Sequence, residues 1–246
     1  MKAVITGASS GLGAAFAKWL SLCQYTVVLI ARHEEDLLRL QEELPNKSEI
    51  IVADLTDMTD ISKVCAYLQE EKVDMLINNA GIGCYGEFWK IPVNQEKTMM
   101  ELNMLAPALL MKSYIAYQET GRILNVASIA AKQADPLMAG YGASKAFLLM
   151  LSKSVNVELT YSSKAILIQT CLPGSFISDF DKQANITHSL AKEGSDDIAE
   201  KIMRDVFKNK KIIVPGTKNK GAYYLGKIIP ERIMNKIEYK LQKSKE

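Results

Sequence analysis

The residues best suited to chemistry are Tyr141 and Lys145, which lie four positions apart in the stretch YGASK. Four residues make about one helical turn, so the phenol and the ammonium group project from the same face of a helix. A tyrosine has a pKa of about 10 in isolation, and a nearby cation lowers that value by stabilising the phenolate. The pair could exchange a proton with an alcohol or a carbonyl, or it could serve only the structure.

Ser128 is a second candidate, because it ends the apolar stretch GRILNVAS thirteen residues before Tyr141. If this stretch is a strand of a parallel sheet, Ser128 lies at the carboxyl edge, where such sheets bind ligands. Its hydroxyl could hydrogen-bond a substrate oxygen while Tyr141 delivers the proton. A serine that caps or closes a loop is the alternative.

A glycine-rich segment, TGASSGLG at residues 6–13, directly follows the first apolar run. Gly7 can form a turn that a side chain would obstruct, Gly11 lets a ligand approach the backbone, and Gly13 lets the next helix pack closely on the sheet. The free N–H groups of that helix then face an anion, most economically a diphosphate. The same spacing would also suit a strand-to-helix turn without a ligand.

Arg32 follows the second apolar run, and Ala31 rather than a carboxylate ends that run. A carboxylate there would accept a hydrogen bond from a ribose 2′-hydroxyl, whereas an arginine pairs with a 2′-phosphate. The residue therefore favours NADP(H) over NAD(H), with an ordinary surface arginine as the alternative.

Seven apolar runs rich in Val and Ile must position these residues. They are continuous rather than alternating, which suits strands buried on both faces, and the segments between them are long enough for helices. No Pro/Gly/Ser-rich linker interrupts the alternation. The sequence predicts an α/β fold, a Rossmann-type doubly wound parallel sheet of about seven strands with helices on both faces, in a single dinucleotide-binding and catalytic domain over 1–246. The runs begin at residues 2, 26, 49, 73, 121, 165 and 211.

The composition, 48% hydrophobic and 24% charged, is that of a globular chain with a sizeable core. The four cysteines are scattered and the two histidines are isolated, which argues against a metal site and favours a reducing compartment. No apolar run approaches the roughly 20 residues of a membrane span, and the first strand leaves no room for a signal peptide. We therefore expect a cytoplasmic protein without a nucleic-acid partner.

The end of the chain is basic, with eleven Lys/Arg against three Asp/Glu from Lys208 to Glu246. Apolar residues recur there every four positions, at Ile229, Ile233, Ile237 and Leu241. This pattern predicts a basic amphipathic helical extension over 216–246. Packing on its own domain, contact between subunits and docking on a membrane surface all remain open.

Taken together, the motifs resemble those of the short-chain dehydrogenases/reductases over roughly residues 1 to 215. The resemblance implies a catalytic tetrad of Asn103, Ser128, Tyr141 and Lys145. In it Tyr141 is the acid/base, Ser128 orients and polarises the carbonyl, Lys145 holds the nicotinamide ribose and lowers the tyrosine pKa, and Asn103 positions a water. The shared motifs are TGASSGLG, Asp54-Leu55, NNAG at 78–81, Leu102-Asn103, Ser128, YGASK and Pro173-Gly174.

The resemblance also implies the residues that hold the cofactor. In this family Ser178 is usually a threonine, which keeps a hydroxyl, and Ser10 stands where many NADP-preferring members have a basic residue. The implied cofactor-binding residues are Gly7, Ser9, Ser10, Gly11, Leu12, Gly13, Arg32, Asp54, Leu55, Asn79, Ala80, Gly81, Tyr141, Lys145, Pro173, Gly174 and Ser178.

The expected function is that of an NAD(P)-dependent oxidoreductase, which moves a hydride between NADP(H) and a carbonyl or secondary alcohol. Aromatic and Met residues around 81–89, 130–140 and after Pro173 favour an apolar or amphipathic substrate, such as a ketone, a hydroxysteroid-like compound or a 3-oxoacyl chain. The alternative is an NADPH-binding regulator without turnover, which would have no use for Tyr141 and Ser128. Likeness to the family also implies a homodimer or homotetramer.

Overall fold

A computed structural model describes residues 1–177, 180–184, 186, 193–225 and 229–244 of the chain. Its centre is a seven-stranded sheet in the order β3-β2-β1-β4-β5-β6-β7, and every strand pairs in parallel with its neighbours. The predicted fold class is confirmed. The strands are β1 (Lys2–Thr6), β2 (Thr26–Ala31), β3 (Ser48–Val52), β4 (Met75–Asn78), β5 (Thr120–Val126), β6 (Ala165–Cys171) and β7 (Ile212–Ile213).

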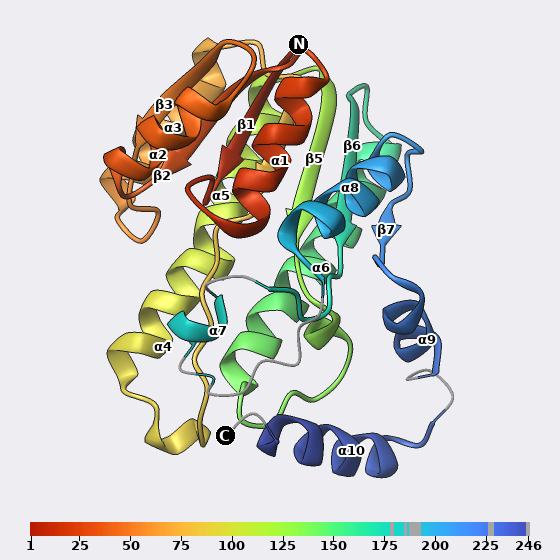
Figure 1. Ribbon diagram of the computed structural model, residues 1–246. Helices are drawn as coiled ribbons and strands as arrows, with labels where there is room; N and C mark the ends of the chain where they lie inside the picture. The colour runs from red at the N-terminus through yellow and green to blue at the C-terminus, as the bar shows by residue number, and fades with distance from the viewer. Residues whose placement is uncertain (178–179, 185, 187–192, 226–228, 245–246) are drawn as a thin grey trace.

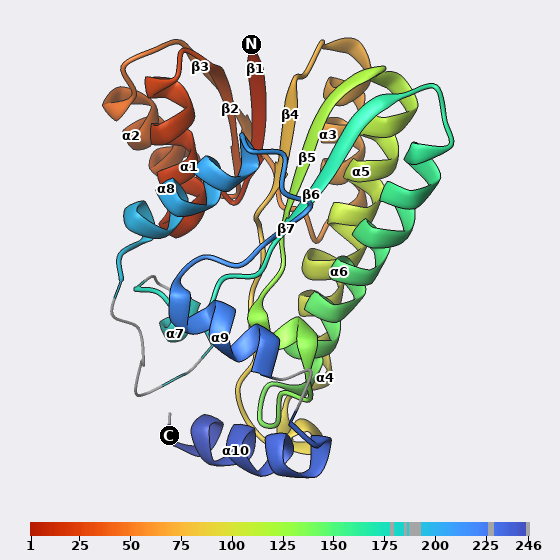
Figure 2. The same ribbon diagram turned by 90° about the vertical axis from the view of Figure 1, so that its right-hand side faces the viewer.

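Helices cover both faces of the sheet, and Figure 2 shows the three layers. On one face α1 (Gly11–Leu22), α2 (Glu34–Glu43) and α8 (Ser195–Val206) pack on the strands through side chains such as Phe16, Leu37 and Ile202. On the other face lie α3 (Met58–Glu70), α5 (Ala106–Tyr117) and α6 (Ala139–Thr160), with side chains such as Leu68 and Tyr114 in a second core. The central parts of the strands are largely apolar because both faces of the sheet are buried.

The remaining elements lie beyond the carboxyl ends of the strands, in the lower half of Figure 1. They are η1 (Phe88–Lys90), α4 (Val93–Met100), the π turn η2 (Glu101–Leu105), the 3₁₀ helix η3 (Ile129–Lys132), α7 (Phe180–Gln183), α9 (Thr217–Leu225) and α10 (Glu231–Lys243). Within the described ranges, no helix combines the length and the apolar character that a membrane span requires.

Strand order reverses between β1 and β4, the next strand after β3 being placed on the other side of β1. In an open parallel sheet this switch point opens a crevice at the carboxyl edge, where ligands bind. The glycine turn after β1 and the segment after β4 meet there, so the topology alone puts both motifs at one site.

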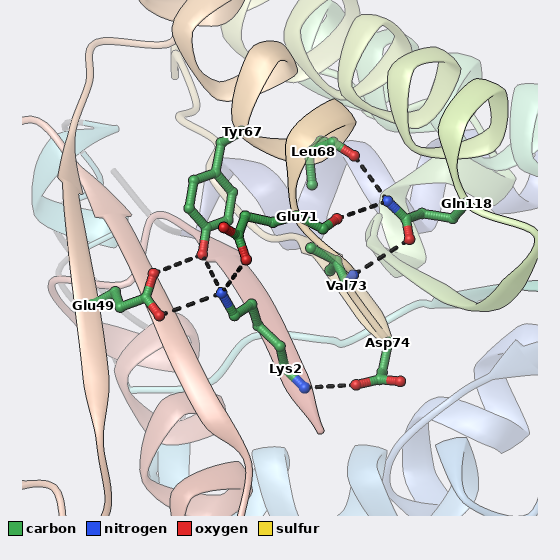
Figure 3. Close-up of polar contacts among 8 residues, drawn as sticks. All are labelled: Lys2, Glu49, Tyr67, Leu68, Glu71, Val73, Asp74 and Gln118. Atoms are coloured by element: carbon green, nitrogen blue, oxygen red, sulfur yellow. Dashed lines mark hydrogen bonds and ion pairs between the residues drawn. The ribbon is translucent and has the colours of Figure 1, made fainter.

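At the amino-terminal ends of the strands, away from the crevice, a polar network links the sheet to α3, and it contains no residue of the predicted site (Figure 3). The Lys2 ammonium donates to the hydroxyl of Tyr67 at 2.9 Å and to Glu71 at 2.8 Å, and Tyr67 donates to Glu49 at 2.7 Å. Burial raises the pKa of Tyr67 to about 12, so its hydroxyl keeps its proton. These contacts join β1, β3 and α3, while Gln118 ties the end of α3 to the loop before β4.

Candidate active site

The glycine-rich turn links the end of β1 to α1. Gly7 and Gly11 have φ angles of +62° and +54°, in the left-handed region that favours glycine. A Cβ placed on Gly7 would lie 2.8 Å from the Cα of Ala80, and one on Gly13 would lie 2.1 Å from the carbonyl oxygen of Gly7. The turn and the start of α1 can approach their neighbours this closely only because these residues lack side chains.

The N-terminus of α1 is suited to bind an anion. Its N-cap, Ser10, makes no side-chain hydrogen bond to the helix, and the first turn contains no acidic residue. The first N–H groups of an α-helix lack partners within the helix, and the helix dipole attracts negative charge to them. Ser9, Ser10, Gly11 and Leu12 all line one large cavity, so a phosphate at this end would meet free backbone donors.

Asn79 holds the glycine turn against the end of β4. Its side-chain amide donates to the carbonyl oxygens of Thr6 and Gly7, each at 3.0 Å. The hydroxyl of Thr6 in turn accepts from the backbone N–H groups of Asn79 and Ala80, each at 3.0 Å. The NNAG motif therefore shapes the turn from the neighbouring strand as well as lining the cavity.

Arg32 and Asp54 mark the far wall of the same cavity, at the ends of β2 and β3. One carboxylate oxygen of Asp54 accepts from the backbone N–H of Thr56 at 3.0 Å and from its hydroxyl at 2.8 Å. Leu55 is buried between the sheet and α3 and also reaches the cavity. This wall is thus held in place by local hydrogen bonds and core packing.

Ser128, Tyr141 and Lys145 come together from β5 and α6. Ser128 follows β5 and accepts a hydrogen bond from the N–H of Ala130 at 3.2 Å, which caps η3. Tyr141 lies in the first turn of α6, and Lys145 follows one turn later, with its Nζ 5.7 Å from the centre of the tyrosine ring. The Lys145 ammonium donates to the carbonyl oxygen of Val126 at 3.0 Å, which ties α6 to the end of β5.

Burial dominates the electrostatics of this group. It raises the pKa of Tyr141, and a hydrogen bond with Ser128 opposes the rise without cancelling it. Burial also lowers the pKa of Lys145 to about 8. The pKa of Tyr141 is raised, not lowered as we expected from the lysine cation, because desolvation of the phenolate is the largest effect, and the phenol is neutral at pH 7.

Asn103 lies in the π turn between α4 and α5, an irregularity that is frequent at functional sites. Its side chain exchanges two hydrogen bonds with the backbone of Ile82, at 3.0 and 2.9 Å, and donates to the hydroxyl of Ser144 at 3.0 Å. A Cβ on Gly81 would lie 3.0 Å from both Asn103 Oδ1 and Lys145 Nζ. Asn103 therefore fixes the segment after β4 against α6, next to the lysine.

The cavity has a volume of about 750 Å³, and it extends from Arg32 to Tyr141 and beyond. Sixteen of the residues predicted for the site line it, while Gly13 and Asn103 lie behind its wall and Ser178 lies outside the described residues. The sixteen are Gly7, Ser9, Ser10, Gly11, Leu12, Arg32, Asp54, Leu55, Asn79, Ala80, Gly81, Ser128, Tyr141, Lys145, Pro173 and Gly174.

Part of the predicted substrate wall is also present. Met138, Phe176 and Phe180 line the cavity, and the Phe180 ring lies 5.1 Å from that of Tyr141. Phe88 and Trp89, in contrast, are exposed on η1 and do not belong to the described cavity wall. Their aromatic character alone could not tell a pocket residue from a surface one.

Sequence reasoning missed the contribution of the last helix. Glu238, Leu241 and Gln242 of α10 line the cavity, together with Gln133 and Asp135 of the loop before α6. The four-residue apolar repeat correctly indicated a helix, but nothing in the local pattern shows against which part of the fold it packs. Asn219 of α9 also reaches the cavity, beside Gly174.

A doubly wound sheet with a glycine turn after its first strand, and a serine, a tyrosine and a lysine in the same cavity, defines a nucleotide-binding oxidoreductase of the Rossmann class. The sequence model of the family described as short chain dehydrogenase matches residues 1–189. The chain belongs to this family.

The chain is similar to relatives with described functions. The chain is 32% identical over 183 residues to the very-long-chain 3-oxoacyl-CoA reductase of Anas platyrhynchos, an alignment that covers 70% of the chain but only 58% of that relative. It is 28% identical over 248 residues to the 17-beta-hydroxysteroid dehydrogenase type 3 of Mus musculus, covering 96% of the chain and 77% of the relative. A short-chain dehydrogenase from Sphingobium yanoikuyae, solved in complex with NADPH, superposes with a TM-score of 0.81 at 30% identity over 88% of each chain.

Proposed function

We propose that this protein is an NADP(H)-dependent oxidoreductase that interconverts a carbonyl and a secondary alcohol on an apolar or amphipathic substrate. The observation that carries the proposal is the meeting of Ser128, Tyr141 and Lys145 in the cavity that also contains the glycine turn and the N-terminus of α1. One cavity thereby offers a phosphate-binding end and a proton-donating end.

The cavity fits a nicotinamide dinucleotide. Gly7 and Gly11 have no side chains to keep a ligand away from the backbone of the turn, and the N-terminus of α1 offers N–H donors to a diphosphate. At the other side of the turn, Asp54 and Leu55 would flank the adenine. Near the other end, Gly81 and Lys145 line the cavity where we place the nicotinamide ribose. When bound, the dinucleotide supplies the hydride that the carbonyl carbon gains.

The protein residues supply the proton and orient the oxygen. Tyr141 is a neutral phenol, and burial raises its pKa further, so its hydroxyl is present to donate a proton to the substrate oxygen as the carbon gains the hydride. In the oxidative direction the same oxygen takes the proton back. Ser128 donates a hydrogen bond to the substrate oxygen and so polarises the carbonyl. The raised pKa keeps Tyr141 in the protonated form that carbonyl reduction consumes, so reduction is the direction that we propose.

Arg32 is the basis for proposing NADP(H) rather than NAD(H). It lines the cavity directly after β2, where an adenosine ribose would lie, and Ala31 leaves no carboxylate at the strand end. A guanidinium binds a 2′-phosphate through charge-assisted hydrogen bonds. The structural relative solved with NADPH supports this assignment.

The substrate class follows from the wall around Tyr141. Met138, Phe176 and Phe180 give that end of the cavity an apolar surface. The relatives named above act, by name, on 3-oxoacyl-CoA and hydroxysteroid compounds, both of which have large apolar parts. We infer a ketone or 3-oxoacyl compound of this amphipathic kind.

The direct test compares wild type with Tyr141→Phe. The variant should bind NADPH normally in a calorimetric titration, and its turnover of a reducible ketone should fall at least 100-fold, because general acid catalysis is worth about 10²–10⁴-fold. Tyr161→Phe, at an exposed tyrosine after α6, is the matched control and should keep full activity. Unchanged turnover in Tyr141→Phe would exclude the proposed proton donor, and NADPH binding without turnover of any carbonyl by the wild type would indicate a regulator.

A second copy of the chain is the partner that we propose for the outer face of α5 and α6. Phe147, Met150 and Val157 of α6 expose apolar side chains there, as does Leu105 at the end of η2, and Met150 is 61% exposed. The three on α6 recur at helical spacing, so they form a stripe rather than scattered exceptions. Burying this stripe against its symmetry copy would give the dimer that we expect.

A further inference from the structure

Helix α10 is fixed to the rest of the protein by polar groups. Gln242 is 5% exposed, Glu238 lines the cavity one turn before it, and both side chains contact the loop that precedes α6. On the other side, the hydroxyl of Tyr85 donates to the backbone carbonyl of Gln242 at 2.7 Å, which ties the helix to the segment after β4. The side of α10 that meets the fold is therefore the side that carries Glu238 and Gln242.

The apolar repeat of α10 lies on a different side of the helix. Ile233, Ile237 and Leu241 follow one another every four residues, so they form one stripe along the helix, and each of them is between 45% and 52% exposed. An amphipathic helix of a globular domain usually turns such a stripe toward the core. In α10 polar side chains take that position, and the described fold leaves the apolar stripe half uncovered.

Basic residues form a second stripe beside the apolar one. Three of them directly precede an apolar residue of the first stripe, and one position is about 100° around a helix, so the two stripes run side by side. Of the two acidic residues, Glu238 faces the cavity and Glu231 lies in the first turn. Within the described ranges, none of these bases is paired with a carboxylate. The basic residues, all exposed, are Arg232, Lys236, Lys240 and Lys243.

A second group of apolar side chains is exposed at the same end of the molecule. Trp89 is 77% exposed and Val93 is 84% exposed, and Phe88 beside them is exposed as well. The segment that carries them follows Tyr85, whose hydroxyl binds α10, and in Figure 1 both the segment and α10 lie beyond the carboxyl ends of the strands. Tryptophan is enriched where proteins meet the headgroups of a bilayer. We call residues 88–93 and the outer side of α10 the basal face.

We propose that the basal face docks on a lipid bilayer with anionic headgroups, with α10 lying in the plane of the surface. A helix with an apolar stripe beside a row of Lys and Arg binds in this way, because the apolar side chains enter the boundary of the acyl chains while the cations meet the headgroup phosphates. A second copy of the chain would instead bring two identical sets of cations together, and like charges across an interface repel. The charge of the basal face thus selects an anionic lipid surface as its partner.

Docking has a consequence for access to the cavity. Leu241 belongs to the exposed apolar stripe and also lines the cavity, so the stripe reaches the cavity wall. An amphipathic ketone dissolved in the bilayer would then meet the protein next to the cavity. This consequence rests on the proposed function, whereas the docking itself does not.

The experiment measures co-sedimentation of the full-length protein with vesicles, without nucleotide or ketone. The vesicles consist of phosphatidylcholine alone or of phosphatidylcholine with about one third phosphatidylserine. The protein should bind the mixed vesicles at least tenfold more tightly, since each basic residue near an anionic surface is worth about fivefold in affinity. Raising NaCl from about 0.1 M to about 0.5 M should weaken this binding, because salt screens the charges.

Two sets of substitutions assign the binding to the basal face. Ile237→Glu interrupts the apolar stripe and should lower the affinity for mixed vesicles at least tenfold. Leu22→Glu is the matched control, because it makes the same change in charge at an exposed apolar residue at the far end of α1, and it should bind as wild type.

The second set removes positive charge from the basal face. Lys236→Gln with Lys240→Gln should lower the affinity about 25-fold. Lys47→Gln with Lys72→Gln removes the same charge from exposed positions before β3 and β4, and this pair should bind as wild type. Should Ile237→Glu not fold, the two lysine pairs still decide, because they change only exposed side chains.

Each remaining outcome decides a different point. A wild type that binds no vesicle, or binds both kinds equally, would refute docking on an anionic surface. An equal loss in a variant and its matched control would overturn the assignment to the basal face. If no vesicle is bound and Ile237→Glu lowers the mass in sedimentation velocity, the face is an interface between copies and the proposal fails. A wild type that binds mixed vesicles but reduces no ketone would refute the proposed function and leave the docking intact.

Discussion

Burying the charged ammonium group of Lys145 lowers the free energy of unfolding, and this cost can be measured. The residue is 4% exposed, and burial lowers the pKa of its ammonium group from 10.5 to about 8. A difference of one unit between the pKa values of the unfolded and folded states corresponds to about 1.4 kcal/mol. Burying the charged side chain therefore lowers the free energy of unfolding by about 3 kcal/mol at pH 7. Lys145→Met removes that cost but leaves the carbonyl of Val126 without its donor, a loss of about 1 kcal/mol. The variant should be about 2 kcal/mol more stable than wild type at pH 7.

The sign of the pH dependence follows from the direction of the shift. The folded pKa is lowered, so between about pH 8 and pH 10.5 the unfolded chain binds more protons than the folded protein. The contribution of Lys145 to the free energy of unfolding therefore rises with pH through that window. From pH 7 to pH 9.5 the wild type should gain about 2 kcal/mol relative to Lys145→Met, and the gap between the two proteins should nearly close.

Urea unfolding without nucleotide, followed by circular dichroism at both pH values, measures the gap. Lys72→Met, which replaces an exposed lysine in the loop before β4, is the matched control and should differ from wild type by the same amount at both pH values. A gap for Lys145→Met that does not change with pH, or a variant less stable than wild type at pH 7, would refute the reasoning. The first result would mean that the ammonium is not desolvated; the second would mean that its hydrogen bond outweighs its burial.

Three further changes test other parts of the structure. Arg32→Ala should raise the KM for NADPH about 10- to 100-fold and leave that for NADH nearly unchanged, because only NADPH has the 2′-phosphate; an equal effect on both would remove Arg32 from cofactor choice. Gly13→Ala should lower the free energy of unfolding by about 3 kcal/mol in urea, since its Cβ would lie 2.1 Å from a backbone oxygen, whereas Gly221→Ala, where a Cβ meets nothing within 4 Å, should not. Met150→Glu should convert a dimer to a monomer in sedimentation velocity, and an unchanged mass would exclude the α5 and α6 face as the interface.

Much of this protein is determined by local sequence. Continuous apolar runs indicated all seven strands, because a strand buried on both faces has no polar side. Only β7 is much shorter than its run, since it pairs with β6 through Ile212 and Ile213 alone. The glycine turn and the Tyr141–Lys145 spacing were equally readable, because φ preference and helical periodicity act over a few residues.

Tertiary structure decided what depends on distant parts of the chain. The tyrosine and the lysine were predictable as a pair, but the directions of their pKa shifts come from burial, which the whole fold sets. The position of Asn103 against Ile82 required the chain to bring the π turn η2 beside the segment that follows β4. Gln242 meets Asp135 across 107 residues of sequence, and no local periodicity contains that contact. The sequence alone thus determined the strands, the turn and the reactive pair, while the fold determined their protonation and the far wall of the cavity, because desolvation and long-range packing exist only once the chain is folded.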